Sequence, residues 1–225
     1  LFRSTRRAGA RLNGRVEAPA RAVPSTPVTD RFDEILDEAG VLRSLDAPRA
    51  EVWSSGLAAE WPDLADLIDR LQQARRPEAL DVLCALAAIE PHRAIAAAEA
   101  HRAAHGTAAP SWAPAVGTAQ AELAWEILDP FSGNTSIVVE YAHADETRHT
   151  MLVEVEDDLA VDIHFGPPGL VDDAFDESDT RSLSVREVEV PRALERIVDA
   201  LARTAEHDDP PVTDEYVMNL PLAAA

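Results

Sequence analysis

The pattern of apolar and polar positions changes once along the chain, from a helical period to a period of two. Between residues 29 and 105, apolar side chains recur three and four positions apart, which predicts about five helices of about 12 to 15 residues. Pro48, Pro77 and Pro91 stand near the starts of three of these helices, where the missing proline N–H costs no intrahelical hydrogen bond. The N-terminal half is therefore predicted to be helical.

The arrangement of these helices has two interpretations. Short helices with short connections resemble the antiparallel helical hairpins of HEAT arrays. A plain helical bundle is equally consistent, because no set of residue identities repeats at a fixed period. In either arrangement the segment EALDVLCALAAIE, residues 78–90, should lie at the centre, since it is apolar around most of its circumference.

Polar and apolar residues alternate after residue 122, and this period of two predicts four short strands. The alternating apolar residues are Leu123, Trp125 and Ile127; Ile137, Val139 and Tyr141; Met151, Val153 and Val155; and Val161, Ile163 and Phe165. Consecutive strands with short connections indicate an antiparallel meander with one buried face. A fifth strand is expected within residues 182–190, after an acidic loop at 167–181.

An amphipathic helix should cover the apolar face of this sheet. It begins at Pro191, and its apolar side is formed by Leu194, Ile197, Val198 and Leu201. After Glu206, a linker leads to the short apolar terminus DEYVMNLPLAAA, which could dock on the body of the protein or on another subunit.

We therefore predict an α+β protein, with an N-terminal helical bundle or HEAT-like hairpins followed by an antiparallel meander covered by a helix. The expected divisions are a basic flexible arm (1–28), a helical region (29–105), a linker loop (106–121), the sheet with its helix (122–206) and a C-terminal tail (207–225).

Composition removes several chemistries. The chain contains no lysine, which excludes a Walker A phosphate loop, a Schiff-base lysine and a Ser/Lys dyad. Its single cysteine, Cys84, cannot form an intrachain disulfide or a cysteine-based zinc site, and its apolar surroundings predict an inert buried thiol. The sequence has no long apolar span and no signal-peptide core, so we expect a cytoplasmic protein without a membrane contact.

Charge is distributed unevenly along the chain, whose net charge is −21. Residues 1–28 contain six arginines and a single glutamate, so the remainder is even more acidic than the whole. The arginines that we predict to contact an acidic protein partner are Arg3, Arg6, Arg7, Arg11 and Arg15. An acidic body repels nucleic acid, so a nucleic-acid contact is expected only through the arm, if at all. The alternative is a flexible terminus that lies on its own acidic body.

Trp112, in the proline-flanked stretch PSWAP, is a further candidate for partner contact, because an exposed tryptophan is a frequent interface anchor. Burial between the two halves of the chain is the competing interpretation, and it is the one that we favour.

The stretch HADETRHTMLVEVEDDLAVDIHFG, residues 143–166, concentrates three of the seven histidines and seven of the 41 acidic residues. In the predicted meander, the face opposite the apolar one carries Glu154, Glu156, Asp162 and His164, together with Glu140; His149 lies near the start of the third strand. A divalent metal ion bound by carboxylates and imidazoles would relieve the repulsion between these carboxylates. Simple solvation of the face is the favoured alternative, because the stretch has no HExxH or EF-hand spacing.

Other catalytic signatures are also missing from the sequence. It has no G-x-S-x-G nucleophile elbow and no glycine-rich phosphate loop. The favoured function is therefore protein–protein interaction, as an adaptor or regulator with a protein partner or as a homo-oligomer, and without a cofactor. The alternatives are a metal-binding protein or metal-dependent enzyme that uses the acidic strand face, and a nucleic-acid mimic that uses the acidic body.

The stretch DPFSGNTSIVVEYAHADETRHTMLVEVEDDLAVDIHFG lies between the helical half and the acidic loop. In this order of elements, residues 122–166 resemble a family of uncharacterised proteins from high-GC actinobacteria. The resemblance implies a bacterial cytoplasmic setting and no particular activity.

Overall fold

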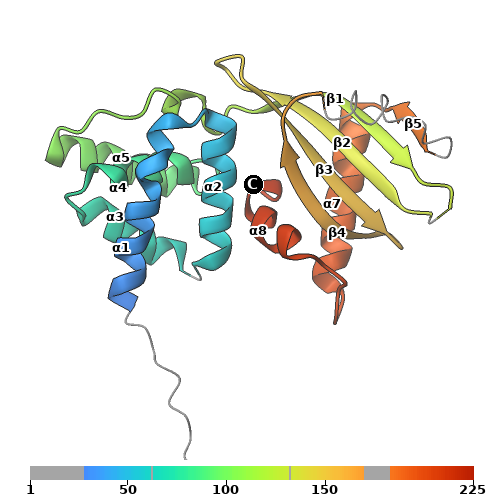
Figure 1. Cartoon of the computed structure of the whole chain (residues 1–225), viewed down its shortest axis with the longest axis horizontal. Helices are drawn as coiled ribbons and strands as arrows, with labels where there is room; N and C mark the ends of the chain where they lie inside the picture. Colours follow the sequence, from blue (N-terminus) through green and yellow to red (C-terminus); the bar gives the residue numbers. More distant parts are fainter. Residues whose placement is uncertain (1–27, 62, 132, 170–182) are drawn as a thin grey trace, which may run out of the picture.

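The computed structural model describes residues 28–61, 63–131, 133–169 and 183–225, and within these it confirms the α+β prediction (Figure 1). A helical part precedes a five-stranded sheet, and two further helices follow the sheet. The helical part consists of α1 (Val28–Glu38), the 3-10 helix η1 (Ala39–Ser44), α2 (Ala47–Glu60), α3 (Leu64–Gln73), α4 (Pro77–Leu86) and α5 (Pro91–His105). After a short 3-10 turn η2 (Ala113–Ala115) come β1 (Gln120–Leu128), β2 (Thr135–Ala142), β3 (Arg148–Glu156), β4 (Leu159–Gly166), β5 (Ser184–Glu187), α7 (Val190–Glu206) and α8 (Asp214–Ala223).

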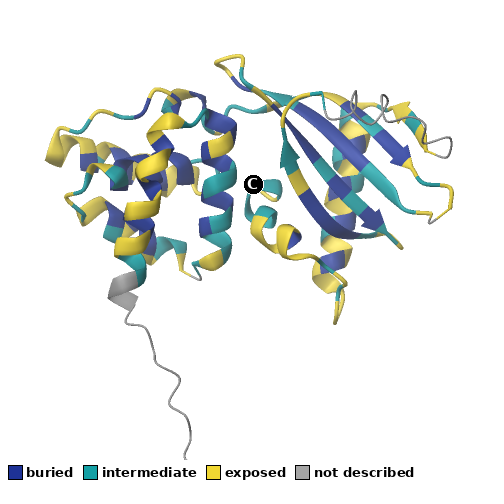
Figure 2. Cartoon of the chain, in the orientation of Figure 1, coloured by how far each residue is buried: buried dark blue, intermediate teal, exposed yellow. Residues whose placement is uncertain are grey.

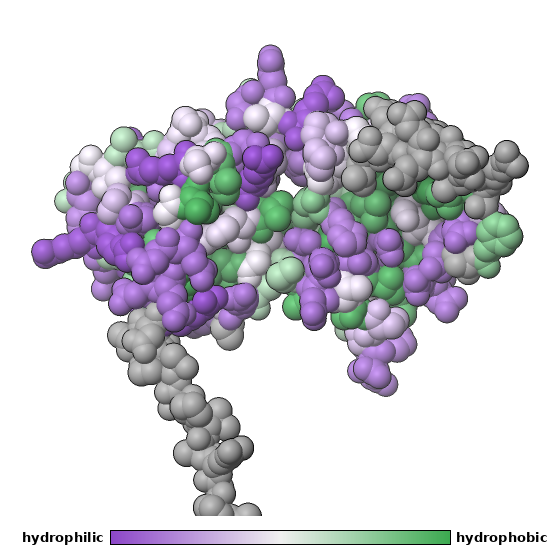
Figure 3. Space-filling view, in the orientation of Figure 1, coloured by the Kyte–Doolittle hydropathy of each residue, from purple (hydrophilic) through white to green (hydrophobic). Residues whose placement is uncertain are grey.

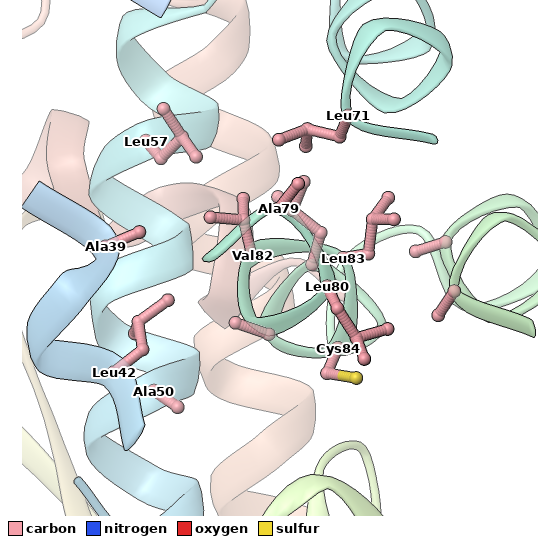
Figure 4. Close-up of a cluster of buried hydrophobic side chains, with 14 of the residues drawn as sticks. Ala39, Leu42, Ala50, Leu57, Leu71, Ala79, Leu80, Val82, Leu83 and Cys84 are labelled. Carbon is pink, nitrogen blue, oxygen red and sulfur yellow. The ribbon is translucent and has the colours of Figure 1, made fainter. Parts of the chain in front are cut away.

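Helix α4 forms the centre of the helical part, as its apolar circumference predicts. Every residue from Ala79 to Leu86 is buried, including Asp81. Leu57 of α2 and Leu71 of α3 approach α4 from two sides (Figure 4). Cys84 is a buried free thiol, and burial raises its pKa to about 11, which leaves it protonated at neutral pH.

The connection between α5 and the sheet is anchored to the helical core. The indole N–H of Trp112 donates to the Leu42 carbonyl at 2.7 Å, and the Trp112 side chain packs in the helical core at 3% exposure. The Arg43 guanidinium donates to the buried Asp81 carboxylate at 2.9 Å and to the Ala108 carbonyl at 3.1 Å. The side chain that we considered as an exposed partner contact is therefore enclosed by one half of the chain, because its N–H finds a buried acceptor there.

The sheet is an antiparallel meander with strand order β4-β3-β2-β1-β5. Helix α7 lies across one face, where it packs on a core that includes Ile137, Val153 and Ile163 (Figures 1 and 2). The residues of α7 that are buried are Ala193, Ile197, Ala200 and Thr204. Val198, which the helical pattern assigned to the covering side, is 62% exposed.

Strand β1 differs from the prediction in the face that its large residues occupy. A register shift between Ala121 and Leu123 places Ala124 on the face covered by α7. Trp125 and Ile127 consequently lie on the other face of the sheet, in a small apolar cluster with Val138. A bulge changes which residues share a face, so alternation alone could not assign them.

Helix α8 closes the free edge of β4. The Thr213 N–H donates to the Val161 carbonyl at 3.1 Å, and the Asn219 side-chain amide donates to the Ile163 carbonyl at 2.7 Å. These bonds satisfy acceptors that an unpaired edge strand would expose to other chains.

The same helix packs against α2, so it lies between the helical part and the sheet (Figure 1). Ser55 of α2 is buried; its hydroxyl donates to the Met218 carbonyl at 2.8 Å and accepts from the Leu222 N–H at 3.1 Å. The apolar terminus thus docks on the body of its own chain. None of the helices in the described ranges has the length and apolar character that crossing a membrane requires.

Candidate functional site

The acidic strand face brings together three of the five predicted metal-ligand candidates. Glu154 on β3 stands directly opposite Asp162 on β4, and His164 lies two residues further along the same face. The Nε2 atom of His164 is 2.9 Å from Oδ2 of Asp162. The other carboxylate oxygen of Asp162 accepts hydrogen bonds from the Ile163 N–H at 2.8 Å and the Thr213 hydroxyl at 2.7 Å. Asp162 therefore helps to hold the start of α8.

The remaining two candidates lie elsewhere. Glu156 accepts a hydrogen bond from the Asn134 side-chain amide at 2.5 Å. His149 lies on the opposite face of the sheet, because it shares the strand parity of Met151 and Val153. In the part of the chain that the structure describes, no group of three or more His, Cys, Asp or Glu side chains could hold a metal ion. A metal site on this face stays a prediction without a supporting geometry.

The predicted partner-binding arginines Arg3, Arg6, Arg7, Arg11 and Arg15 lie outside the described residues. The same holds for most of the acidic loop, from residue 170 to 182. The adaptor function that rests on the arm stays a prediction.

A different polar cluster lies where the helical part meets the sheet, and we call Glu51, His143 and His149 the junction triad. Glu51 comes from the first half of α2, a helix that begins at the N-cap Asp46. His143 follows β2 in the β2–β3 turn, which is closed by the His143 N–H donating to the Thr147 carbonyl at 2.9 Å. His149 lies near the start of β3. All three residues are buried, at 2%, 5% and 7% exposure respectively.

Hydrogen bonds fix the proton on Nδ1 of His143 and, when His143 is neutral, the tautomer of His149 as well. Nδ1 of His143 lies 3.1 Å from the Ala115 carbonyl, which can only accept, so this nitrogen carries the proton. In the neutral ring, Nε2 of His143 is then an acceptor, and it lies 3.1 Å from Nδ1 of His149. When His143 is neutral, His149 therefore donates from Nδ1, which leaves its Nε2 with a free lone pair. The hydrogen bonds of the described residues include none to that Nε2, and it is not among their buried polar atoms without a partner, so water can reach it.

Glu51 supplies the negative charge of the junction triad. One carboxylate oxygen accepts from the Gly117 N–H at 2.8 Å, and the other is 3.8 Å from Nε2 of His143. Burial raises the pKa of Glu51, and the Gly117 N–H together with the nearby His143 offsets part of that rise. The carboxylate also ties α2 to the loop that leads into β1.

Burial has the opposite effect on His149, because it disfavours the charged imidazolium. It lowers the pKa of His149 to about 4; proximity of His143 lowers it further, and Asp46 opposes the shift. Tyr141 stacks on the His149 ring at 5.1 Å with an interplanar angle of 6°, and Phe165 lies 5.9 Å from it. His149 is therefore a neutral ring, clamped by aromatic neighbours, at neutral pH.

Two cavities share the His149 and Phe165 side chains. One, of about 380 Å³, lies beside the start of α2 and the end of β4; we call it the junction pocket. The other, of about 270 Å³, also borders Glu51, Tyr141 and the end of α8. In the space-filling view, hydrophobic residues reach the surface in the middle of the molecule, between the helical part and the sheet (Figure 3). The site is thus a partly apolar hollow with one imidazole nitrogen that no described residue occupies.

Sequence analysis identified His149 but grouped it with the wrong neighbours, and it did not identify Glu51 or His143 as site residues. A signal for His149 was present, because an imidazole at an apolar strand position is expected to be buried. Glu51 offered no comparable signal, since its contact with His143 joins segments far apart in the sequence.

Comparison with known proteins adds no further assignment: no protein-family model, no curated protein and no solved structure significantly matches this chain. The resemblance to actinobacterial proteins accordingly stays a prediction. The candidate site therefore rests on its own geometry.

Proposed function

We propose that the protein binds a small molecule in the junction pocket, with Nε2 of His149 accepting a hydrogen bond from it. The observation that carries this proposal is the lone pair of His149, which is held in a fixed orientation by His143 beside two cavities. Small-molecule sites are typically apolar hollows with a few fixed polar groups, and they occur preferentially between structural units.

Binding explains the junction triad better than general base catalysis does. An efficient general base has a pKa near the working pH. The pKa of His149, at about 4, lies well below neutrality, so the ring would be a weak base although it is fully available as an acceptor. Its clamping by Tyr141 and Phe165 supports a role in orienting a ligand.

A fragment screen by protein-observed NMR tests the proposal on the full chain. Fragments should shift the resonances of His149 and of the residues around it, and His149→Phe should weaken their binding about tenfold, since a good hydrogen bond contributes about 1.4 kcal/mol. Val52→Phe provides a second variant, because it fills part of the junction pocket and replaces neither histidine. It should also reduce binding.

The matched control is His164→Phe, which removes a half-exposed histidine from the other face of the same sheet. It should leave fragment binding unchanged. Fragments that bind wild type and both pocket variants equally would contradict the proposal, as would a complete absence of fragments near His149.

A second proposal is the adaptor function predicted from the sequence, supported by the six arginines in residues 1–28 of a chain with net charge −21. Five arginine-to-glutamine substitutions, at positions 3, 6, 7, 11 and 15, should abolish capture of an acidic partner, because bidentate arginine–carboxylate contacts would be lost. Retained capture of the same partner would contradict this proposal.

A further inference from the structure

We propose that the ligand of the junction pocket is a small organic carboxylate with an apolar body and a hydroxyl or amine hydrogen-bond donor. This inference deepens the proposed function and rests on it. Three features of the pocket wall carry it: two arginines, an apolar lining and the acceptor nitrogen of His149.

The arginines give the pocket a positive wall in an otherwise acidic protein. Arg49 and Arg148 both border it, and Asp46 is the single acidic residue among the described residues of its wall. The Asp46 carboxylate is already engaged, because it accepts from the Arg49 N–H at 3.1 Å as the N-cap of α2. The pocket therefore favours an anion, although the whole chain has a net charge of −21.

Both guanidinium groups keep donors for a ligand. The Arg49 side chain is 74% exposed, and its ion pair with Asp46 is long, at 4.0 Å. Arg148 is 46% exposed and uses one terminal nitrogen for Glu122 at 2.8 Å. Each guanidinium has five N–H donors in a planar fork that matches a carboxylate, so several remain available at the pocket.

The rest of the wall limits the size and polarity of the ligand. Apolar surface comes from Pro48, Val52, Phe165, Pro167 and Pro168. The volume of about 380 Å³ lies near the lower end of the range of about 300–1,000 Å³ for small-molecule sites, which suits a single ring or a branched chain better than a nucleotide.

The histidine sets the third requirement, which is a donor on the ligand. Nε2 of His149 has no proton when both imidazoles are neutral, so a ligand hydroxyl or amine can donate to it, whereas a second carboxylate would be repelled by its lone pair. A ligand that lacks the donor should bind more weakly, because it would displace water from Nε2 without replacing the hydrogen bond.

Isothermal titration calorimetry with four ring compounds tests this ligand class on the full-length protein. 4-Hydroxybenzoate carries both the carboxylate and the hydroxyl donor, and benzoate lacks the hydroxyl donor. 4-Hydroxybenzamide replaces the carboxylate with a neutral amide, and 4-hydroxybenzylamine replaces it with a positively charged amine. 4-Hydroxybenzoate should bind at least about tenfold more tightly than each of the others, the factor expected for one lost interaction of about 1.4 kcal/mol.

Variants assign the effect to the pocket. The double variant R49Q/R148Q should reduce the affinity for 4-hydroxybenzoate to that for the amide, and H149F should reduce it to that for benzoate. R203Q is the matched control, because Arg203 is an exposed arginine of α7 paired with Asp158, away from the pocket. It should leave the affinity unchanged.

The outcomes separate this inference from the proposed function. Equal binding of the acid, amide and amine, abolished by H149F but not by R49Q/R148Q, would overturn the carboxylate assignment and leave the pocket as a binding site. Failure of all four compounds would overturn the ligand class, and the fragment screen would then decide the proposed function. Binding that survives every variant would overturn both.

Discussion

The free energy of unfolding should depend on pH through His149. The perturbation is acidification from pH 7.5 to pH 5.0. In the folded protein the pKa of His149 is about 4, against 6.5 for an unperturbed histidine. Between these two values the unfolded chain binds more protons than the folded one, so stability falls as the pH falls. The contribution is complete above pH 6.5 and is lost progressively as the pH approaches 4.

The size of this stability change follows from the pKa shift of His149. One pKa unit corresponds to about 1.36 kcal/mol, so the full shift is equivalent to about 3.4 kcal/mol. Integrating the proton uptake from pH 7.5 to 5.0 gives a loss of about 2 kcal/mol from this group. In a chain of this length such a loss should lower the melting temperature by about 4–8 °C.

Urea unfolding, followed by tryptophan fluorescence at a series of pH values, measures this effect when wild type is compared with His149→Phe. At pH 7.5 the variant should be less stable by about 1–3 kcal/mol, because His143 loses its partner for Nε2, and this difference should shrink by about 2 kcal/mol on acidification to pH 5.0. Its pH profile should lack the additional loss of about 2 kcal/mol on acidification. His164→Phe controls for the removal of a histidine as such. Parallel profiles of wild type and H149F would refute the argument that burial holds His149 neutral.

Three further substitutions test the packing that positions the site. Ser55→Ala removes both hydrogen bonds from α2 to α8; it should destabilise the fold by about 1–3 kcal/mol, and hydrogen exchange should show faster exchange of α8 amides than in wild type. Trp112→Phe removes one of the two donors to the Leu42 carbonyl, which keeps the Leu45 N–H, and it should cost about 0.5–1.5 kcal/mol in chemical unfolding; an unchanged midpoint would mean that water replaces the indole. Glu126→Gln weakens a buried carboxylate held by two arginines; we expect a loss of about 1–3 kcal/mol at pH 7, discounted because both arginines are partly exposed. That loss should shrink at acidic pH, because burial acts to raise the pKa of Glu126 but the arginine hydrogen bonds lower it below its usual value, so its stabilising charge is lost as the pH falls through that pKa.

Local signals account for most of the fold that could be predicted from the sequence. Proline lies in the first turn of α2, α4 and α5, and apolar spacing identified the buried positions of α4. The alternation over residues 122–166 predicted the meander. Each of these signals lies within one element, so no tertiary information was required.

The errors arise where the outcome depends on contacts between distant segments. Trp125 lies on the face away from α7 because of a bulge, and no residue type marks a bulge in this strand. Docking of α8 depends on Ser55, whose partners lie at the other end of the chain. The sequence does not show which residues a buried helical serine contacts. It therefore could not decide whether the terminus docks on its own chain or on another subunit.

The candidate site was less predictable for the same reason. Sequence alternation contains the information that His149 shares a face with Met151, and attention to that parity would have separated it from the acidic face. Glu51 and His143 become a site only when α2 meets the β2–β3 turn. The strand pattern could place Glu154 and Asp162 on one face, because that placement depends only on alternation within each strand.

The location of the junction triad argues against a purely structural role. The helical core and the core under α7 are mainly apolar clusters, whereas Glu51, His143 and His149 are buried together between them. Joining two structural units does not require such groups, because apolar side chains of similar volume often stabilise a buried contact as well as or better than charged and polar ones. The triad also places beside a cavity an imidazole nitrogen that accepts no hydrogen bond from the described residues, a feature that joining the two units does not require. A group that completes this acceptor from the cavity side accounts for both features, and the ligand proposed for the junction pocket would do so.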